Sequence, residues 1–118
     1  MSKELLGVSA LGLMVLGEFC AIYSEVVTAR LAHTPGQSWQ AFALPVTLMC
    51  IAGLFLLGAY WLGYRAVGDI WTVTVVSVIS LLLLEPIVVW CLFQEAPGRG
   101  ALIGFGLGAL GMLSTVLL

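Results

Sequence analysis

Charge is the property this sequence has least of, and its scarcity excludes several classes of protein. Only 8% of the 118 residues are charged, with six acidic and four basic side chains, while 62% are hydrophobic. A soluble domain of this size buries only about two-thirds of its unfolded surface, too little to hide so much apolar area. Disorder requires low hydrophobicity and high charge, and nucleic-acid binding requires a basic surface. The composition therefore predicts an integral membrane protein and excludes a soluble enzyme.

The sequence also lacks any cysteine pattern typical of a metal site or a redox motif. Its three cysteines, Cys20, Cys50 and Cys91, lie in apolar runs, with no CxxC spacing and no histidine nearby. The simplest interpretation is that they are small apolar packing residues. We therefore expect neither a metal nor another cofactor.

What the sequence does contain is four long apolar runs, at about residues 5–31, 41–62, 70–93 and 100–118. Each run approaches or exceeds the roughly 20 residues that a helix needs to cross about 30 Å of hydrocarbon. The connections are short, which makes neighbouring helices antiparallel. The sequence therefore predicts an all-α fold, a single bundle of four transmembrane helices over residues 1–118. We expect a multi-pass protein of a bacterial inner (cytoplasmic) membrane.

The basic residues are divided equally between the two ends of this bundle. Lys3 and Arg65 lie on one side, and Arg30 and Arg99 lie on the other. Lysine and arginine set the orientation of membrane helices, so this balance predicts little orienting bias. Either the chain inserts both ways round or a partner fixes its orientation; the alternative is that four charges are too few to interpret.

An acidic residue, Glu18, stands at the centre of the first apolar run. A carboxylate at mid-bilayer costs roughly 2.5 kcal/mol or more, and such groups normally face a bundle interior or a cavity and are functional. Because desolvation favours the neutral acid, this carboxyl group can exchange its proton for a cationic ligand. The alternative is a protonated glutamic acid that only hydrogen-bonds to a neighbouring helix.

Two further acids are secondary candidates for the same site. Glu25 follows Glu18 by two helical turns and so lies on the same face, nearer the membrane interface. It either relays cations or protons, or is an interfacial acid paired with Arg30. Glu85 precedes Pro86 in the third run, where the missing backbone donor favours a kink. It either lines a cavity or gate, or marks the end of the membrane helix.

Aromatic residues gather around the second connection, residues 63–69. Most residues of this kind anchor a protein at the membrane interface. Trp71, at the start of the third run, could instead supply a cation–π wall. Tyr64 is a secondary candidate for the same site.

The last apolar run carries glycines at four-residue spacing. Gly100, Gly104 and Gly108 are followed by Gly111, and small residues at this spacing let two membrane helices approach closely. We expect Gly104, Gly108 and Gly111 to form a helix-packing or dimerisation face, within the subunit or between subunits.

In combination, these features resemble the drug/metabolite transporter superfamily, and most closely its four-helix small multidrug resistance family. The shared features cover nearly the whole chain: Gly17-Glu18, the turn at residues 62–68 before an aromatic-bearing run, and the glycine-rich run at residues 103–111. The sequence Leu84-Glu85-Pro86, followed by Glu95, is instead similar to EamA-type transporters of the same superfamily.

The resemblance implies an antiparallel homodimer, or a heterodimer with a related small subunit. Two copies of Glu18 would share one central site, loaded in turn with protons and a small-molecule cation. Trp71 falls where the family has an aromatic residue near that site. One difference is that residues 75–78 (Val-Val-Ser-Val) stand where the family has the glycine pair that lets its third helix bend.

Three functions remain open. The first is a proton-coupled exporter of small cationic or hydrophobic compounds, with Glu18 as the shared carboxylate and a cavity lined by acids and aromatics. The second is a flippase, or a flippase subunit, for a lipid-linked or polar metabolite, with a lateral opening to membrane lipid. The third is an accessory subunit of a larger membrane complex, with a buried, hydrogen-bonded Glu18 and no cavity.

Overall fold

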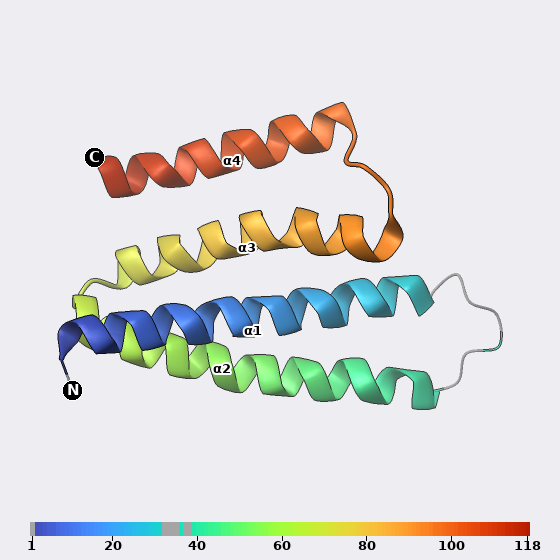
Figure 1. The fold of residues 1–118 in the computed structure, drawn as a ribbon, viewed down its shortest axis with the longest axis horizontal. Coiled ribbons are helices and arrows are strands. Elements are labelled where there is room, and N and C mark those ends of the chain that lie inside the picture. Colours follow the sequence, from blue (N-terminus) through green and yellow to red (C-terminus); the bar gives the residue numbers. More distant parts are fainter. Residues whose placement is uncertain (1, 32–35, 37–38) are drawn as a thin grey trace.

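The computed structural model describes residues 2–31, 36 and 39–118, and nearly all of them are helical (Figure 1). The helices are α1 (Lys3–Leu31), α2 (Ala43–Val67), α3 (Ile70–Phe93) and α4 (Arg99–Leu117), and a short 3-10 helix, η1 (Trp39–Phe42), precedes α2. The described residues form no strand, so the prediction of an all-α fold is confirmed. Most of the first connection, residues 32–40, lies outside the described residues.

Three helical segments of the described chain are long and apolar enough to cross a membrane: Lys3–Leu31, Gln40–Val67 and Ile70–Phe93. Their length and composition indicate a membrane-embedded protein. The 19 residues of α4 correspond to about 28 Å of helix at 1.5 Å per residue. A fourth span remains a prediction.

The second connection is shorter than the sequence predicts. The apolar run ends at about residue 62, whereas α2 continues to Val67. It stops there because Gly68 is left-handed, with φ 79°, and donates its N–H to the Tyr64 carbonyl at 2.7 Å. The carboxylate of Asp69 then caps α3 by accepting a hydrogen bond of 3.1 Å from the Trp71 N–H. Hydropathy alone does not detect these two caps.

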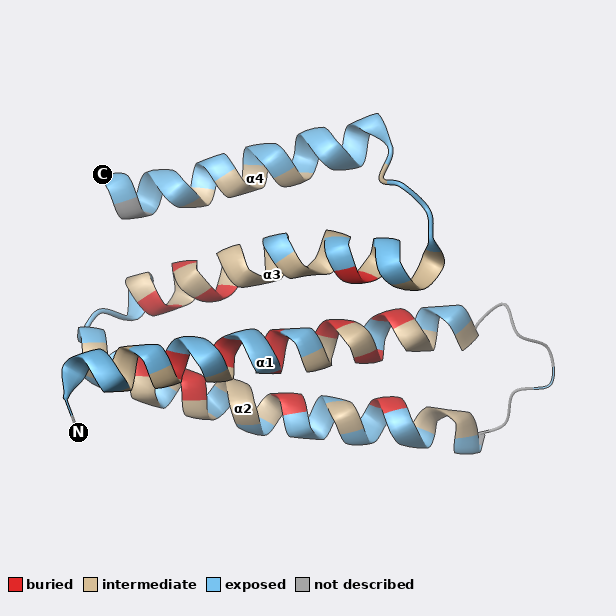
Figure 2. Cartoon of the chain, in the orientation of Figure 1, coloured by how far each residue is buried: buried red, intermediate tan, exposed pale blue. Residues whose placement is uncertain are grey.

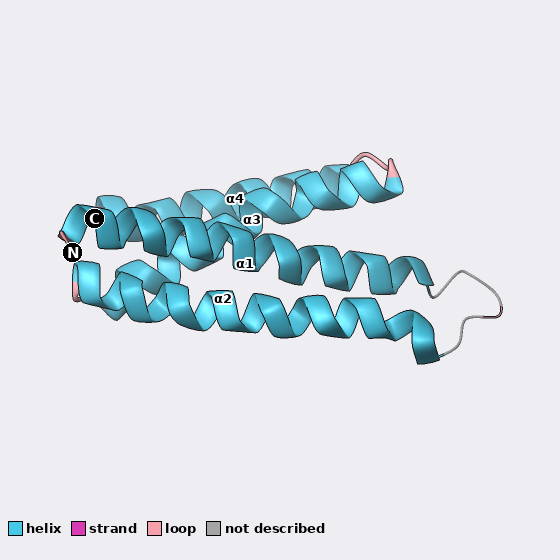
Figure 3. Cartoon of the chain, turned by 60° about the horizontal axis from the view of Figure 1, so that its bottom comes forward, coloured by secondary structure: helices cyan, strands magenta, loops and turns pink. Residues whose placement is uncertain are grey.

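α1 contacts both α2 and α3, α2 also contacts α3, and α4 packs on α3 (Figures 1 and 3). The principal extents of the molecule are 51 × 34 × 17 Å. The shortest of them exceeds the diameter of one helix with its side chains, about 10–12 Å. Buried residues lie on α1, α2 and α3, and no described side chain of α4 is buried (Figure 2). Within one chain α4 therefore lies at the edge of a three-helix core, and a closed four-helix bundle remains a prediction.

Two clusters of buried side chains hold the core together. One joins α1, α2 and α3, and the other joins α1 and α3. Their buried members are Met14, Ala59 and Val73 in the first, and Ile22, Val26 and Val88 in the second. Because Glu18 lies between Met14 and Ile22 on α1, it sits between the two apolar clusters.

Close packing of α1 on α2 depends on a glycine. A Cβ atom at Gly17 would lie 2.8 Å from Cγ of Leu56 and 3.2 Å from its backbone nitrogen. A Cβ atom at Gly12, on the same helix, would meet nothing within 4 Å. The residue before Glu18 therefore has a packing role that its place in the sequence does not reveal.

The third helix passes through its proline. α3 continues past Pro86 to Phe93, so the interpretation that a membrane helix ends at Glu85 is wrong. The helix ends where Gln94 turns left-handed, with φ 56°, and donates its N–H to the Trp90 carbonyl at 2.7 Å.

The cysteines do not all pack inside the chain. Cys20 is half-buried, whereas Cys50 and Cys91 are exposed. Cys91 lines a small cavity between α3 and α1, together with Phe19 and Tyr23. A packing role for the exposed Cys50 and Cys91 remains a prediction.

Of the three packing glycines expected in α4, one faces a close neighbour in this chain. A Cβ atom at Gly108 would lie 3.4 Å from Cδ1 of Leu82 on α3, whereas at Gly104 and Gly111 it would meet nothing within 4 Å. Packing within the subunit therefore involves Gly108. Contact of Gly104 and Gly111 with another subunit remains a prediction.

We expect Gly108→Ile to lower the unfolding temperature of the detergent-solubilised protein, because the added carbons meet Leu82. Overpacking of this kind costs typically about 1–3 kcal/mol. Gly104→Ile should leave the packing of α4 on α3 within the subunit, and so the unfolding temperature of the monomer, unchanged. If this variant forms a smaller particle in detergent than the wild type does, Gly104 lies at a contact between subunits. Equal thermal stability of Gly108→Ile and the wild type would contradict the contact between α3 and α4.

Candidate proton and cation site

Glu18 is a buried acid in the middle of α1. Its side chain is 8% exposed. It shares a face of α1 with the buried residues Met14 and Ile22, four positions before and after it. The structure therefore places this carboxyl group between helices, where the sequence analysis expects a functional intramembrane acid to lie.

Ser77 of α3 holds the carboxyl group of Glu18. Its hydroxyl donates a hydrogen bond of 2.9 Å to Oε1 of Glu18, and Ser77 is itself 7% exposed. Sequence analysis missed this partner. The available signal is that Ser77 interrupts a run of valines, and serine in membrane helices often hydrogen-bonds across to a neighbouring helix.

The charged groups that act on Glu18 are themselves acidic. They are Glu25, farther along α1, and Glu85 on α3. The hydrogen-bond donor that Glu18 accepts from, the Ser77 hydroxyl, is neutral. Ionised Glu18 would thus carry its charge near two further acids, an expensive situation inside a membrane.

Removing the hydroxyl of Ser77 tests this contact. Ser77→Ala leaves a buried acceptor without its donor, which costs about 1–3 kcal/mol, and should lower the unfolding temperature in detergent. Ser80→Ala is the matched control, because the Ser80 hydroxyl donates within α3, to the Val76 carbonyl at 2.9 Å. If the two variants have the same stability, the hydrogen bond between the helices contributes nothing.

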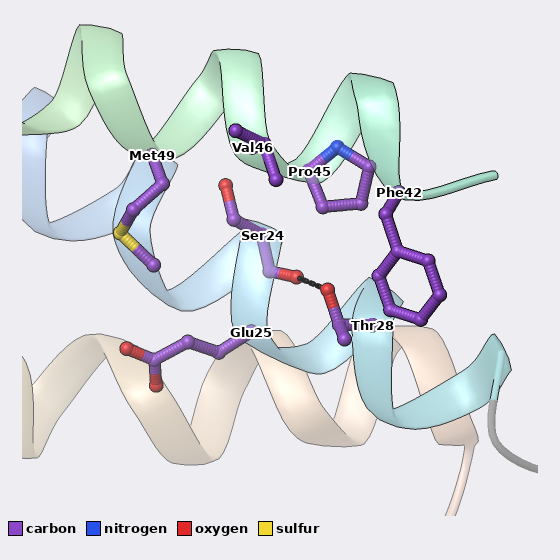
Figure 4. A pocket seen from close by; sticks show the side chains of 7 residues that line it. All are labelled: Ser24, Glu25, Thr28, Phe42, Pro45, Val46 and Met49. Carbon is purple, nitrogen blue, oxygen red and sulfur yellow. Dashed lines mark hydrogen bonds between the residues drawn. The ribbon is translucent and has the colours of Figure 1, made fainter. Parts of the chain in front are cut away.

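Glu25 lines a cavity that does not include Glu18. It is exposed and lines a cavity of about 400 Å³ between α1 and the first turns of α2 (Figure 4). The full lining is Ser24, Glu25, Thr28, Phe42, Pro45, Val46 and Met49. The structure thus gives Glu25 a cavity of its own.

Glu85 lines a second cavity, of about 260 Å³, beside the connection from α3 to α4. Glu95 lines the same cavity, together with Phe105 of α4. The structure therefore brings together the two acids that resemble the EamA-type pattern. Glu18 lines neither this cavity nor the one beside Glu25.

The aromatic candidates lie at the other end of the molecule. Trp71 is 71% exposed at the start of α3, and Tyr64 is 51% exposed near the end of α2. The described residues show no contact of either one with Glu18. Nearby, the guanidinium of Arg65 stacks 5.3 Å from the ring of Trp61, an arrangement that suits the membrane interface.

Comparison with protein-family models, with curated proteins and with solved structures gives no match for this chain. The resemblance to small multidrug resistance proteins therefore rests on the order and spacing of the residues quoted for it.

Proposed function

We propose that this protein is a multi-pass membrane transporter with four spans, which exports small cationic or hydrophobic compounds in exchange for protons. The observation that carries the proposal is a carboxyl group, Glu18, buried between α1 and α3 with the neutral Ser77 hydroxyl as its hydrogen-bond partner. Such a group can hold a proton or a cation, but not both well.

The Ser77 hydroxyl suits both states of Glu18. A serine hydroxyl rotates and is both donor and acceptor. It can therefore donate to the ionised carboxylate and accept from the protonated acid. We expect the empty protein to hold the proton near neutral pH, because an isolated charge at this depth is expensive. A bound cation supplies the missing positive charge, and the proton leaves.

The proposal requires a space beside Glu18, and neither of the cavities described at Glu25 and Glu85 includes this residue. We propose that a second copy, or a related small subunit, completes it, as the resemblance to antiparallel dimers implies. In one chain α4 packs on α3 and has no described buried residue, which leaves apolar faces for such a partner. The proposed location is the inner membrane of a bacterium.

An accessory subunit is the second candidate. The observation that favours it is that Ser77 already satisfies Glu18 within one chain, and the cavities at Glu25 and Glu85 do not include Glu18. In that role Glu18 would only join α1 to α3.

A proton-flux assay distinguishes these functions. Liposomes that contain the protein, with an acidic interior and a trapped pH indicator, would receive benzyltrimethylammonium from outside. An exchanger should let protons out as the cation enters, faster than in protein-free liposomes. The absence of cation-dependent proton flux would contradict the exchanger and leave the accessory subunit or the flippase.

A further inference from the structure

The cavity between α1 and α2 has the dimensions of a small-molecule site. Its volume is about 400 Å³, within the roughly 300–1,000 Å³ of typical ligand pockets. Residues of η1 and α2 form one wall, and all four are apolar: Phe42, Pro45, Val46 and Met49. This wall suits an apolar ligand body.

The opposite wall, from α1, presents one acid and two hydroxyl groups. The Ser24 hydroxyl donates to the Cys20 carbonyl at 2.7 Å, and the Thr28 hydroxyl donates to the Ser24 carbonyl at 2.8 Å. Both hydroxyl protons are thus used inside α1. Glu25 is the one charged residue of the lining, so the charge of the cavity is negative.

We infer that this cavity binds a monovalent organic cation with an apolar body, at a site separate from Glu18. The carboxylate of Glu25 pairs with the positive charge, and the α2 wall covers the rest of the ligand. In Figure 4 the Glu25 carboxylate lies at the same end of the view as Met49 but on the α3 side of the α1 ribbon, and Phe42 lies at the opposite end.

The two acids are separate sites on one helix. Glu25 follows Glu18 by seven helical positions, a rise of about 10 Å, so one small cation does not contact both. A role for the Glu25 cavity as a waiting site for transport rests on the proposed function. Binding itself does not, and can be measured whether or not the chain transports anything.

The test uses a protein in which the other acid is already neutral. Calorimetry in detergent would compare benzyltrimethylammonium with its uncharged isostere neopentylbenzene, in the Glu18→Gln variant. We expect Glu18→Gln to bind the cation, and Glu18→Gln/Glu25→Gln to bind it at least tenfold more weakly. Affinity for neopentylbenzene should be the same in both. Glu18→Gln/Glu4→Gln is the matched control, because Glu4 is an exposed acid at the other end of α1, and it should bind the cation like Glu18→Gln.

A second variant fills the cavity and keeps its charge. Val46 is 58% exposed on the α2 wall, so Val46→Trp in the Glu18→Gln protein should weaken binding of both compounds. Equal cation affinity with and without Glu25, or tighter binding of neopentylbenzene than of the cation, would overturn the inference. Loss of all cation binding in Glu18→Gln alone, with the protein folded, would also overturn it while supporting a site at Glu18. Transport without binding at Glu25 would leave the proposed function standing.

Discussion

Gly17→Val should destabilise the protein more than any other single substitution considered for its packing. The new side chain must occupy space where even a Cβ atom would lie 2.8 Å from Cγ of Leu56 and 3.2 Å from its backbone nitrogen. The helix propensities of glycine and valine differ by only a few tenths of a kcal/mol, so packing decides the outcome. Overpacking costs typically about 1–3 kcal/mol, and we expect the upper end because a backbone atom cannot rotate away.

The control for this prediction is the same substitution at Gly12, where a Cβ atom meets nothing within 4 Å. Thermal unfolding in detergent should give a much lower midpoint for Gly17→Val than for Gly12→Val. Adding Leu56→Ala to Gly17→Val should recover part of the loss, because it removes the side-chain half of the clash. Equal midpoints for the two valine variants would contradict the close approach of α1 and α2.

Glu18→Gln should reduce cation-driven proton flux in liposomes to the rate of protein-free liposomes. Glutamine keeps the size of the side chain and can still accept the hydrogen bond of Ser77, which is 2.9 Å long in the wild type. It cannot carry a proton or a negative charge, so exchange has no chemical basis. The variant should therefore fold and assemble yet fail to couple.

Three further variants should be measured beside Glu18→Gln. Glu4→Gln, which removes an exposed acid at the start of α1, should keep the wild-type flux. Glu18→Asp should keep some flux and shift its pH dependence, because the shorter carboxyl group lies in different surroundings relative to Ser77, Glu25 and Glu85. Glu25→Gln should have a smaller effect than Glu18→Gln, because Glu25 is exposed. Wild-type flux in Glu18→Gln would eliminate this residue as the coupling group.

The sequence predicts the helices well because their signal is local. Apolar length places α3 at residues 70–93, where the structure has Ile70–Phe93. Glu18 can be recognised as a candidate from the sequence because a charged carboxylate in the bilayer has a high free-energy cost. The errors lie at the ends of helices, where Gly68 and Asp69 set the boundary by backbone conformation and capping rather than by hydropathy.

The partner of Glu18 could not be predicted, because it depends on how α3 is rotated about its axis. Thr72, Thr74, Ser77 and Ser80 all carry hydroxyl groups on this helix. A helix that is apolar on every side does not reveal which face meets its neighbour. For the same reason, the sequence could not show that Gly108 meets α3 while Gly104 does not. The cavity at Glu25 could not be predicted either, because it depends on how α1 packs on α2.

The central claim is that one carboxyl group, Glu18, exchanges a proton for a cation. The most direct measurement is the number of protons released when benzyltrimethylammonium is added to the purified protein in weakly buffered detergent near neutral pH. The wild type should release protons as it binds the cation, Glu25→Gln should still release them, and Glu18→Gln should bind without release. Release that is unchanged in Glu18→Gln, or absent from the wild type while the cation binds, would contradict the claim.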